Sequence, residues 1–253
     1  MTTAAPPQTA PFDIDEAMRR VTAAVSGYPL PSMFQLAADG FATPFQQLAA
    51  CVISIRTLEE VSLPSSRRLF AAAPDPATIA ALPVAEIERL IAPSTFADRK
   101  AVQIRAMAET VLRDHAGELP CDGAVMQSFA GVGPKCSQLA LGIACLRRGR
   151  PYRVAGRPGK PGDPAADDGT TQGRVIPVDI HVHRVTNRWD YVRTRTPEAT
   201  MVALERVLPL EYDVEINRLL VPFGKHICSA VPRCPSCPLV DICPKEGVTR
   251  VRA

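Results

Sequence analysis

Apolar residues recur at intervals of three and four along most of the chain, a spacing that places them on one face of an α-helix. No segment shows the strict alternation of apolar and polar residues that is typical of a half-buried strand. Helix-start residues at one end, and glycine or proline at the other, mark the limits of many of these stretches. The expected helices cover residues 13–27, 57–70, 84–91, 98–115, 122–129, 134–147, 196–207 and 211–226, with others opening at 43 and 75. The sequence therefore predicts an all-α fold.

Several of these helices carry specific start or stop signals. Thr43 is followed by proline, which suits the first position of a helix. Thr57 and Glu60 form the spacing of a capping box, and Asp98 is the expected cap of the helix that ends near residue 115. Pro222 is expected to kink the last helix or to end it early.

Two stretches depart from the helical pattern. Residues 1–11 are rich in proline, alanine and threonine, and we expect a disordered tail there. Residues 150–174 are dominated by proline, glycine, aspartate and arginine, and so long an irregular stretch is uncommon inside a compact domain. We favour a plain inserted loop, and the alternative is a basic arm. The arm would present Arg150, Arg153, Arg157, Lys160 and Arg174.

Composition narrows the possibilities without naming a partner. A chain of 253 residues, 46% hydrophobic and 22% charged, is typical of a soluble protein with one large or two small domains. The formal net charge of +3 is too small to indicate a nucleic-acid binder by itself. No apolar run approaches the ~20 residues of a membrane helix, and the first residues do not form a secretory signal. We therefore expect a cytoplasmic protein without a membrane partner.

Eight cysteines divide into two groups. Four are scattered, and core packing is their expected role; they are Cys51, Cys121, Cys136 and Cys145. The other four follow the spacing Cys-x5-Cys-x2-Cys-x5-Cys and predict a metal site; they are Cys228, Cys234, Cys237 and Cys243. From spacing alone, tetrahedral zinc and a [4Fe–4S] cluster are equally good interpretations.

A glycine hairpin leads directly into a helix at Gly131-Val132-Gly133-Pro134-Lys135. The turn allows close approach to its backbone, and the N–H groups at the start of a helix favour a phosphate. A lysine at this place can simply contact that phosphate. It can also attack a sugar carbon and form a Schiff base, provided that the helix terminus and partial burial lower its pKa from ~10.4.

These features together resemble the endonuclease III family of DNA glycosylases, from about Thr43 to Cys243 apart from the insertion, which widens the family's spacing by about two dozen residues. The motif Gly-Val-Gly-x-Lys implies that Lys135 displaces a damaged base from C1′, with β-elimination at the 3′ phosphate to follow. Asp179, in Val-Asp-x-His, is implied as the partner carboxylate, although an aspartate there also suits a helix N-cap. Gly131, Val132 and Gly133 are implied to contact DNA.

The resemblance also implies a wedge that fills the space left by an extruded base. Arg56 and Phe96 stand at the two matching places. The alternatives are a charge at the end of a helix for Arg56 and a core aromatic for Phe96. Both residues are therefore candidate DNA-binding residues.

For the clustered cysteines, the resemblance favours [4Fe–4S] over zinc. The family pattern is Cys-x6-Cys-x2-Cys-x5-Cys, so the first interval of this chain is one residue short. We expect Cys228, Cys234, Cys237 and Cys243 to bind the cluster in a structural role.

The resemblance implies two lobes. A six-helix barrel would cover residues 35–149 and contain the helix–hairpin–helix motif at 122–147, and an iron–sulfur lobe would combine 12–34 with 150–253. The implied function is a bifunctional DNA glycosylase and abasic-site lyase, acting as a monomer on oxidised pyrimidines and abasic sites in duplex DNA. The alternatives are a monofunctional glycosylase with another or narrower substrate, and a catalytically weak DNA-binding relative.

Overall fold

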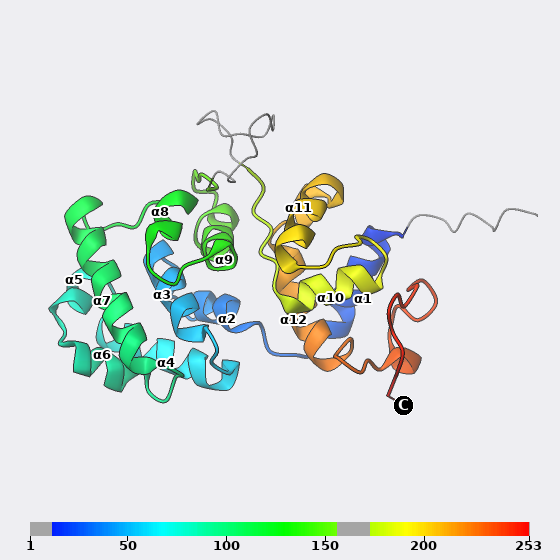
Figure 1. Cartoon of the computed structure of the whole chain (residues 1–253), viewed down its shortest axis with the longest axis horizontal. Helices are drawn as coiled ribbons and strands as arrows, with labels where there is room; N and C mark the ends of the chain where they lie inside the picture. The colour runs from blue at the N-terminus through cyan, green and yellow to red at the C-terminus, as the bar shows by residue number, and fades with distance from the viewer. Residues whose placement is uncertain (1–11, 156–172, 253) are drawn as a thin grey trace, which may run out of the picture. The chain divides into compact units, whose positions relative to one another are not determined.

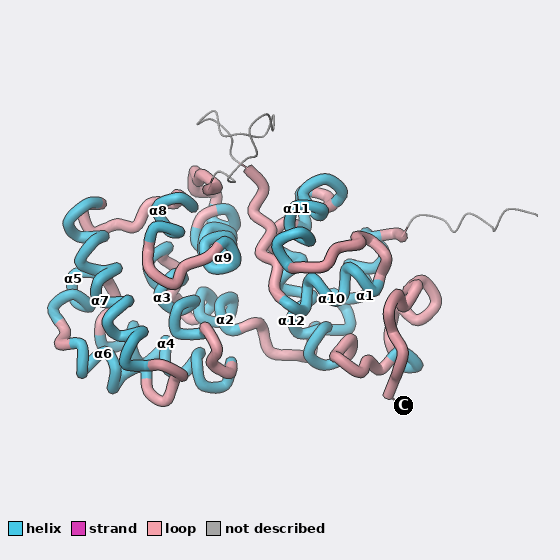
Figure 2. The backbone as a smooth tube through the Cα atoms, in the orientation of Figure 1, coloured by secondary structure: helices cyan, strands magenta, loops and turns pink. Residues whose placement is uncertain are grey.

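The computed structural model describes residues 12–155 and 173–252, and these residues confirm the all-α prediction. In the described residues Figure 2 shows helices and loops, and strand-like pairing there is limited to one isolated bridge, between Asp122 and Arg153. None of the helices in this part of the chain combines the length and hydropathy that a membrane crossing requires. The expected tail at 1–11, and Arg157 and Lys160 of the insertion, lie outside the described residues.

The chain divides into two compact units. The smaller unit comprises Met1–Tyr28, Ile180–Leu208 and Leu219–Ala253, and the larger comprises Pro29–Asp179 and Pro209–Arg218. The predicted limits of the larger domain were residues 35 and 149, whereas this unit begins at Pro29 and extends to Asp179. The reason is that side chains beyond the predicted limits belong to its core. Met33 and Phe34 are 5% and 2% exposed in that core, and Val175 is fully buried in it.

The larger unit is a bundle of helices (Figure 1), and its buried side chains form one continuous apolar core. Its α-helices are α2 (Ser32–Ala38), α3 (Pro44–Ser54), α4 (Glu59–Ala72), α5 (Pro76–Ala81), α6 (Val84–Ile91), α7 (Ala97–Asp114), α8 (Gly123–Ser128) and α9 (Pro134–Ala144). Two short 3-10 helices, Leu146–Arg148 and Leu210–Tyr212, also belong to it. Helix α7 packs against α5 and α6, and α3 packs against α9 and α4. Helix α3 begins with Pro44 as predicted, and Thr43 caps it, because its hydroxyl accepts from Gln46 N at 3.2 Å and Gln46 Oε1 accepts from Thr43 N.

The smaller unit contains α1 (Ile14–Val25), α10 (Ile180–Arg188), α11 (Pro197–Val207) and the part of α12 (Glu215–His226) that follows Arg218. Its centre is Trp189, which is 1% exposed. The indole ring stacks on Phe12 with 5.2 Å between centroids and lies 6.3 Å from the ring of Phe223. The chain after α12 has one 3-10 turn, Cys234–Ser236, and is otherwise irregular.

Two predicted helix signals are wrong. Helix α4 follows Leu58 without a side-chain cap, so Thr57 does not form the expected capping box. Helix α7 begins at Ala97 after a left-handed residue, and Asp98 therefore lies inside its first turn. Of the two outcomes expected for Pro222, an early end of the helix does not occur, because α12 continues to His226.

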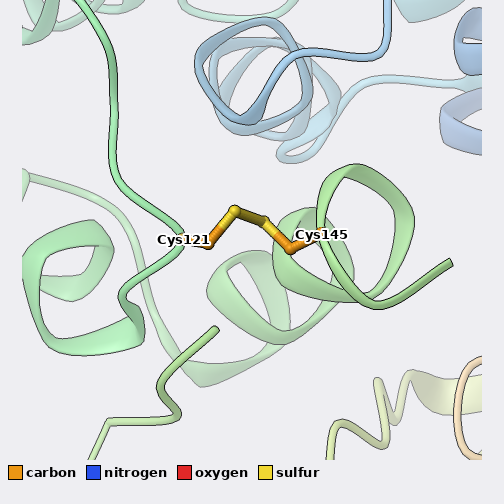
Figure 3. Close-up of a disulfide and its surroundings, with 2 residues drawn as sticks. All are labelled: Cys121 and Cys145. Atoms are coloured by element: carbon orange, nitrogen blue, oxygen red, sulfur yellow. A yellow bond between two sulfur atoms is a disulfide. The ribbon is translucent and has the colours of Figure 1, made fainter. Parts of the chain in front are cut away.

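A disulfide joins Cys121 to Cys145 in the larger unit (Figure 3). Cys145 is fully buried, as core packing predicts, but its bond to Cys121 was not expected. Cys51 and Cys136, also buried, have their sulfur atoms 2.6 Å apart. The disulfide brackets helices α8 and α9.

Candidate functional site

Helices α8 and α9 form the predicted helix–hairpin–helix, and the turn between them has the expected conformation. Gly131 adopts the left-handed region with φ of 79°, and an added Cβ would lie 3.2 Å from the side-chain nitrogen of Gln103. Val132, 8% exposed, anchors the turn in the core. Pro134 is the first residue of α9, and the N–H that proline lacks would have no partner within the helix at that position. The turn is therefore held rigidly at the start of α9.

Lys135 is exposed in the first turn of α9, so the expected partial burial is wrong. The next residue, Cys136, is buried and accepts a hydrogen bond from the Cys51 thiol. This bond lowers the pKa of Cys136, and the nearby Lys135 ammonium adds to the effect. The same bond and burial raise the pKa of Cys51. Lys135 is thus next to a buried pair of thiols in the sequence, while its own side chain is exposed to solvent.

Asp179 is half-buried and immediately precedes the first residue of α10. It belongs to the same unit as Lys135. The chain leading to it packs on α9, because a Cβ added at Gly142 would lie 3.3 Å from Val175. Asn217 Nδ2 also donates to the carbonyl of Pro177 at 3.0 Å. Both predicted catalytic residues therefore lie on segments fixed to one helix.

His181 and Arg184, in the first turns of α10, are bound within the smaller unit. The guanidinium of Arg184 bonds His181 Nδ1 at 3.0 Å and donates to the carbonyls of Gly224 at 2.8 Å and Cys228 at 3.1 Å. Gly224 has no room for a side chain, since an added Cβ would lie 2.8 Å from His181 Nδ1. The arrangement supports a structural role for Arg184.

Arg56 and Phe96 share an unusual conformation. Both have left-handed backbones, with φ of 54° and 57°, and both side chains are exposed. Phe96 is 46% exposed, so the alternative of a core aromatic is wrong. The guanidinium of Arg99 lies 5.8 Å from the centre of its ring. Each residue thus projects from a tight turn of the larger unit.

A lysine that was not predicted as a site residue bonds to the turn that contains Arg56. Lys100, on α7, is 3% exposed. Its Nζ donates to the carbonyls of Ile53 at 2.6 Å and Ile55 at 2.8 Å and to Thr57 Oγ1 at 2.9 Å. The signal was present in the sequence, because Lys100 is one turn before Ile104 on the apolar face of its helix.

The four clustered cysteines line one cavity of the smaller unit, together with Trp189 and Arg188. Arg188 Nη1 donates to Cys228 Sγ at 3.3 Å, and Cys243 Sγ donates to the carbonyl of Arg188 at 3.7 Å. Among the described residues, no group of three or more His, Cys, Asp or Glu side chains is arranged to hold a metal ion. The cavity nevertheless gathers all four predicted ligands.

The donor set of this cavity suits a cationic centre. Burial, together with charge repulsion from the neighbouring cysteines, raises the pKa of Cys237 to about 11. Burial likewise raises the pKa of Cys243. Four thiolates in one partly buried cavity therefore require a positive charge among them.

The chain is similar to known proteins over most of its length. The family model described as "HhH-GPD superfamily base excision DNA repair protein" matches residues 49–210. Endonuclease III-like protein 1 of Mus musculus is 32% identical over 213 residues, covering 81% of this chain and 63% of that protein. Endonuclease III homolog 1, chloroplastic, of Arabidopsis thaliana is 32% identical over 229 residues, covering 85% of this chain and 54% of that protein. The chain thus spans less than two thirds of the length of these relatives.

Solved structures share the fold. "Structure of a non-covalent Endonuclease III-DNA Complex" superposes with a TM-score of 0.68 at 22% identity, covering 92% of this chain and 94% of that one. The family resemblance inferred from the glycine hairpin, the Val-Asp-x-His motif and the cysteine cluster is confirmed. The chain belongs to the HhH-GPD superfamily of base excision DNA repair proteins.

Proposed function

We propose that this protein is a base-excision DNA glycosylase with abasic-site lyase activity, acting on oxidised pyrimidines in duplex DNA. The observation that carries the proposal is the exposed Lys135 in the first turn of α9, directly after a rigid glycine turn, in a member of a base excision repair family. A monomer bound to duplex DNA that contains a damaged base or an abasic site is the proposed assembly.

The hairpin would grip the DNA backbone. Gly131, Val132 and Gly133 leave their backbone accessible to a phosphate, and the N-terminus of α9 carries a partial positive charge. Lys135 follows within one turn, so a phosphate held here would place the adjoining sugar within reach of its amine.

The chemistry needs Lys135 as its neutral amine. The amine attacks C1′, the electrons of the glycosidic bond leave with the base, and the base takes up a proton. Asp179 would stabilise the positive charge that develops on the sugar and accept a proton from the attacking amine. Opening of the sugar ring gives a Schiff base, after which loss of a proton from C2′ expels the 3′ phosphate. A strand break with a bound sugar remnant is the immediate result.

A [4Fe–4S] cluster is the proposed cofactor, with Cys228, Cys234, Cys237 and Cys243 as its ligands. Four thiolates in one cavity supply the charge and donor type that iron–sulfur clusters require. The cluster would supply a fixed cross-link for the irregular chain after α12, and no catalytic step passes through it. A brown protein with about four irons per chain supports this assignment; a colourless protein with zinc contradicts it.

Borohydride trapping tests the catalytic proposal directly. With a duplex that contains an abasic site, borohydride should reduce the Schiff base and leave a stable protein–DNA adduct, and Lys135→Ala should abolish it. Lys225→Ala is the matched control, and its adduct should form as in the unaltered protein. Mass spectrometry of the adduct should place the DNA on Lys135, which is one of only five lysines in the sequence, the others being Lys100, Lys160, Lys225 and Lys245.

The outcome separates the three candidate functions. Base release without strand cleavage or adduct would identify a monofunctional glycosylase. Binding without turnover on any member of a panel of lesion-bearing duplexes would identify a DNA-binding relative. Release restricted to oxidised pyrimidines in that panel would support the proposed substrate class, and release of another base would replace it.

A further inference from the structure

Two exposed side chains of the larger unit stand on backbones that ordinary residues avoid. Left-handed φ angles at Arg56 and Phe96 are unfavourable for residues with a Cβ, and they persist only where the surrounding structure enforces them. Neither turn contains a glycine that would relieve the conformation, since the turns read Ser-Ile-Arg-Thr and Ser-Thr-Phe-Ala. Other contacts must therefore stabilise the left-handed conformations of both residues.

Lys100 bonds to both turns at once. Its ammonium donates to the Ile55 carbonyl and to Thr57 Oγ1, which are the groups on either side of Arg56. Its backbone N–H donates to the carbonyl of Phe96 at 3.0 Å. One residue therefore contacts the neighbours of Arg56 through its side chain and Phe96 itself through its main chain.

The hydroxyl of Thr57 completes the connection. Besides Lys100 Nζ, it accepts from the backbone N–H of Thr95 at 3.1 Å, and it donates to the carbonyl of Ile55 at 3.3 Å. A hydroxyl has two acceptor lone pairs and one proton, and all three are used here. Thr57 and Thr95 are the residues next to Arg56 and Phe96, so this hydroxyl joins the two turns directly.

The charge state of Lys100 matches its surroundings. An ammonium has three N–H donors, and the structure supplies three acceptors. Burial lowers the pKa of Lys100 to about 8, so at pH 7 most of the population still carries the proton that the third bond needs. All three donors are occupied and the side chain is 3% exposed, which leaves no amine available to attack a sugar.

We propose that Lys100 is a positioning residue that locks the Arg56 and Phe96 turns into one rigid wedge, which enters the duplex where a base has been extruded. The inference rests on the proposed function, because it requires DNA as the partner. Lys100 itself touches neither DNA nor the reacting atoms; it acts through the two exposed side chains. Loosening the wedge affects the recognition of a vacant site and leaves the grip of the hairpin on phosphates unchanged.

The test compares two duplexes that need no turnover. One contains tetrahydrofuran, an abasic analogue without the C1′ hydroxyl that ring opening requires, opposite 2-aminopurine; the other is intact. Lys100→Met keeps the length of the side chain and removes the ammonium. Hydrogen bonds from a charged donor are worth a factor of about ten or more, so the preference for the tetrahydrofuran duplex should fall about tenfold. The rise in 2-aminopurine fluorescence on binding should shrink with it.

Two variants at the shared hydroxyl keep the test decisive if Lys100→Met does not fold. Thr57→Val removes the hydroxyl and should lower the same preference about fivefold, because Lys100 keeps its bonds to the carbonyls of Ile53 and Ile55. Thr57→Ser retains the hydroxyl and should behave as the unaltered protein. Circular dichroism at the assay temperature identifies the variants that are folded.

Each outcome has a separate meaning. An equal loss of affinity for both duplexes would show that Lys100 only stabilises the bundle, and would overturn the proposal. Unchanged preference and fluorescence in folded Lys100→Met or Thr57→Val would also overturn it, as would the absence of any preference in the unaltered protein. Failure of borohydride trapping would contradict the lyase assignment alone, since the duplexes used here are not cleaved.

Discussion

The bundle of the larger unit and the irregular chain of residues 227–252 are held together by different means. The bundle has a continuous apolar core in which helices α3, α7 and α9 contribute fully buried side chains. The chain after α12 has one buried leucine, Leu239, and it is held by backbone hydrogen bonds and by arginine side chains from other segments. Arg188 donates to the carbonyls of Ser229 at 2.7 Å and Ala230 at 2.9 Å, and Arg20 bonds Asp241 at 2.7 Å.

The difference shows how the same chain obtains rigidity in two ways. Apolar burial contributes roughly 25 cal/mol for each Å² removed from water, so the bundle needs no cross-link to fold. A segment with little apolar surface cannot offset its loss of conformational entropy and needs a cross-link or a metal. Trp189, the single tryptophan, lines the cysteine cavity, so its fluorescence reports on the smaller unit alone. Far-UV circular dichroism, by contrast, reports on the helices of both units.

The largest expected effect comes from a cysteine of the cavity. In Cys237→Ser, the proposed cluster loses a ligand, and we expect residues 227–252 to lose their order while the bundle keeps its helices. Trypsin should then cut after Arg233 and Lys245 at least tenfold faster, and Trp189 emission should shift to the red. Ser236→Ala, next to the same ligand, is the control and should change neither signal. Unaltered proteolysis in Cys237→Ser would mean that hydrogen bonds order the segment without the cluster.

A core truncation tests the other half of the comparison. Ile104 is fully buried on α7, and Ile104→Ala should lower the free energy of unfolding by about 2–5 kcal/mol through lost burial and a new cavity. Urea denaturation followed by circular dichroism measures this change. If the two units unfold independently, the transition seen by Trp189 fluorescence should stay in place. A shift of both transitions by the same amount would show that they unfold together.

The disulfide is a third source of rigidity, and it lies inside the bundle. Replacing both Cys121 and Cys145 with serine releases a loop of 24 residues, and the entropy of the unfolded chain alone predicts a loss of roughly 3 kcal/mol. The bundle should remain folded, because its core is otherwise intact. Urea denaturation of this variant, and of the unaltered protein with and without a reductant, measures the effect. A loss in the variant without any effect of the reductant would mean that the sulfur atoms act by packing, not by their bond.

The sequence was sufficient for the parts of the fold that depend on local signals. The helix–hairpin–helix followed from two glycines, a proline and the apolar spacing of α9, and the start of α3 followed from the proline after Thr43. The all-α fold followed from helical periodicity without strand alternation. Each of these signals lies within a few residues of the structure that it determines.

Two of the errors arise because distant partners overrule local signals. Thr57 has the spacing of a cap, but its hydroxyl bonds Lys100, 43 residues away. Cys121 and Cys145 are joined across 24 residues, and no local pattern identifies that pairing. Lys135 is exposed because its neighbour Cys136 takes the buried face of α9. The catalytic roles of Lys135 and Asp179, and the cluster, stay predictions.

The smallest effect concerns a helix cap in the smaller unit. Thr196 Oγ1 accepts from Ala199 N at 3.2 Å at the start of α11, and Thr196→Ala should lower the free energy of unfolding by about 1 kcal/mol. Thr196→Ser, which keeps the hydroxyl, is the matched control. Because Trp189 lies in the same unit, the urea midpoint of its fluorescence transition should fall in Thr196→Ala. The midpoint of the circular dichroism change that comes from the bundle should stay the same. A shift of the fluorescence transition alone would show that the smaller unit unfolds separately and that its helix caps contribute to its stability. A shift of both transitions would mean that the two units unfold together.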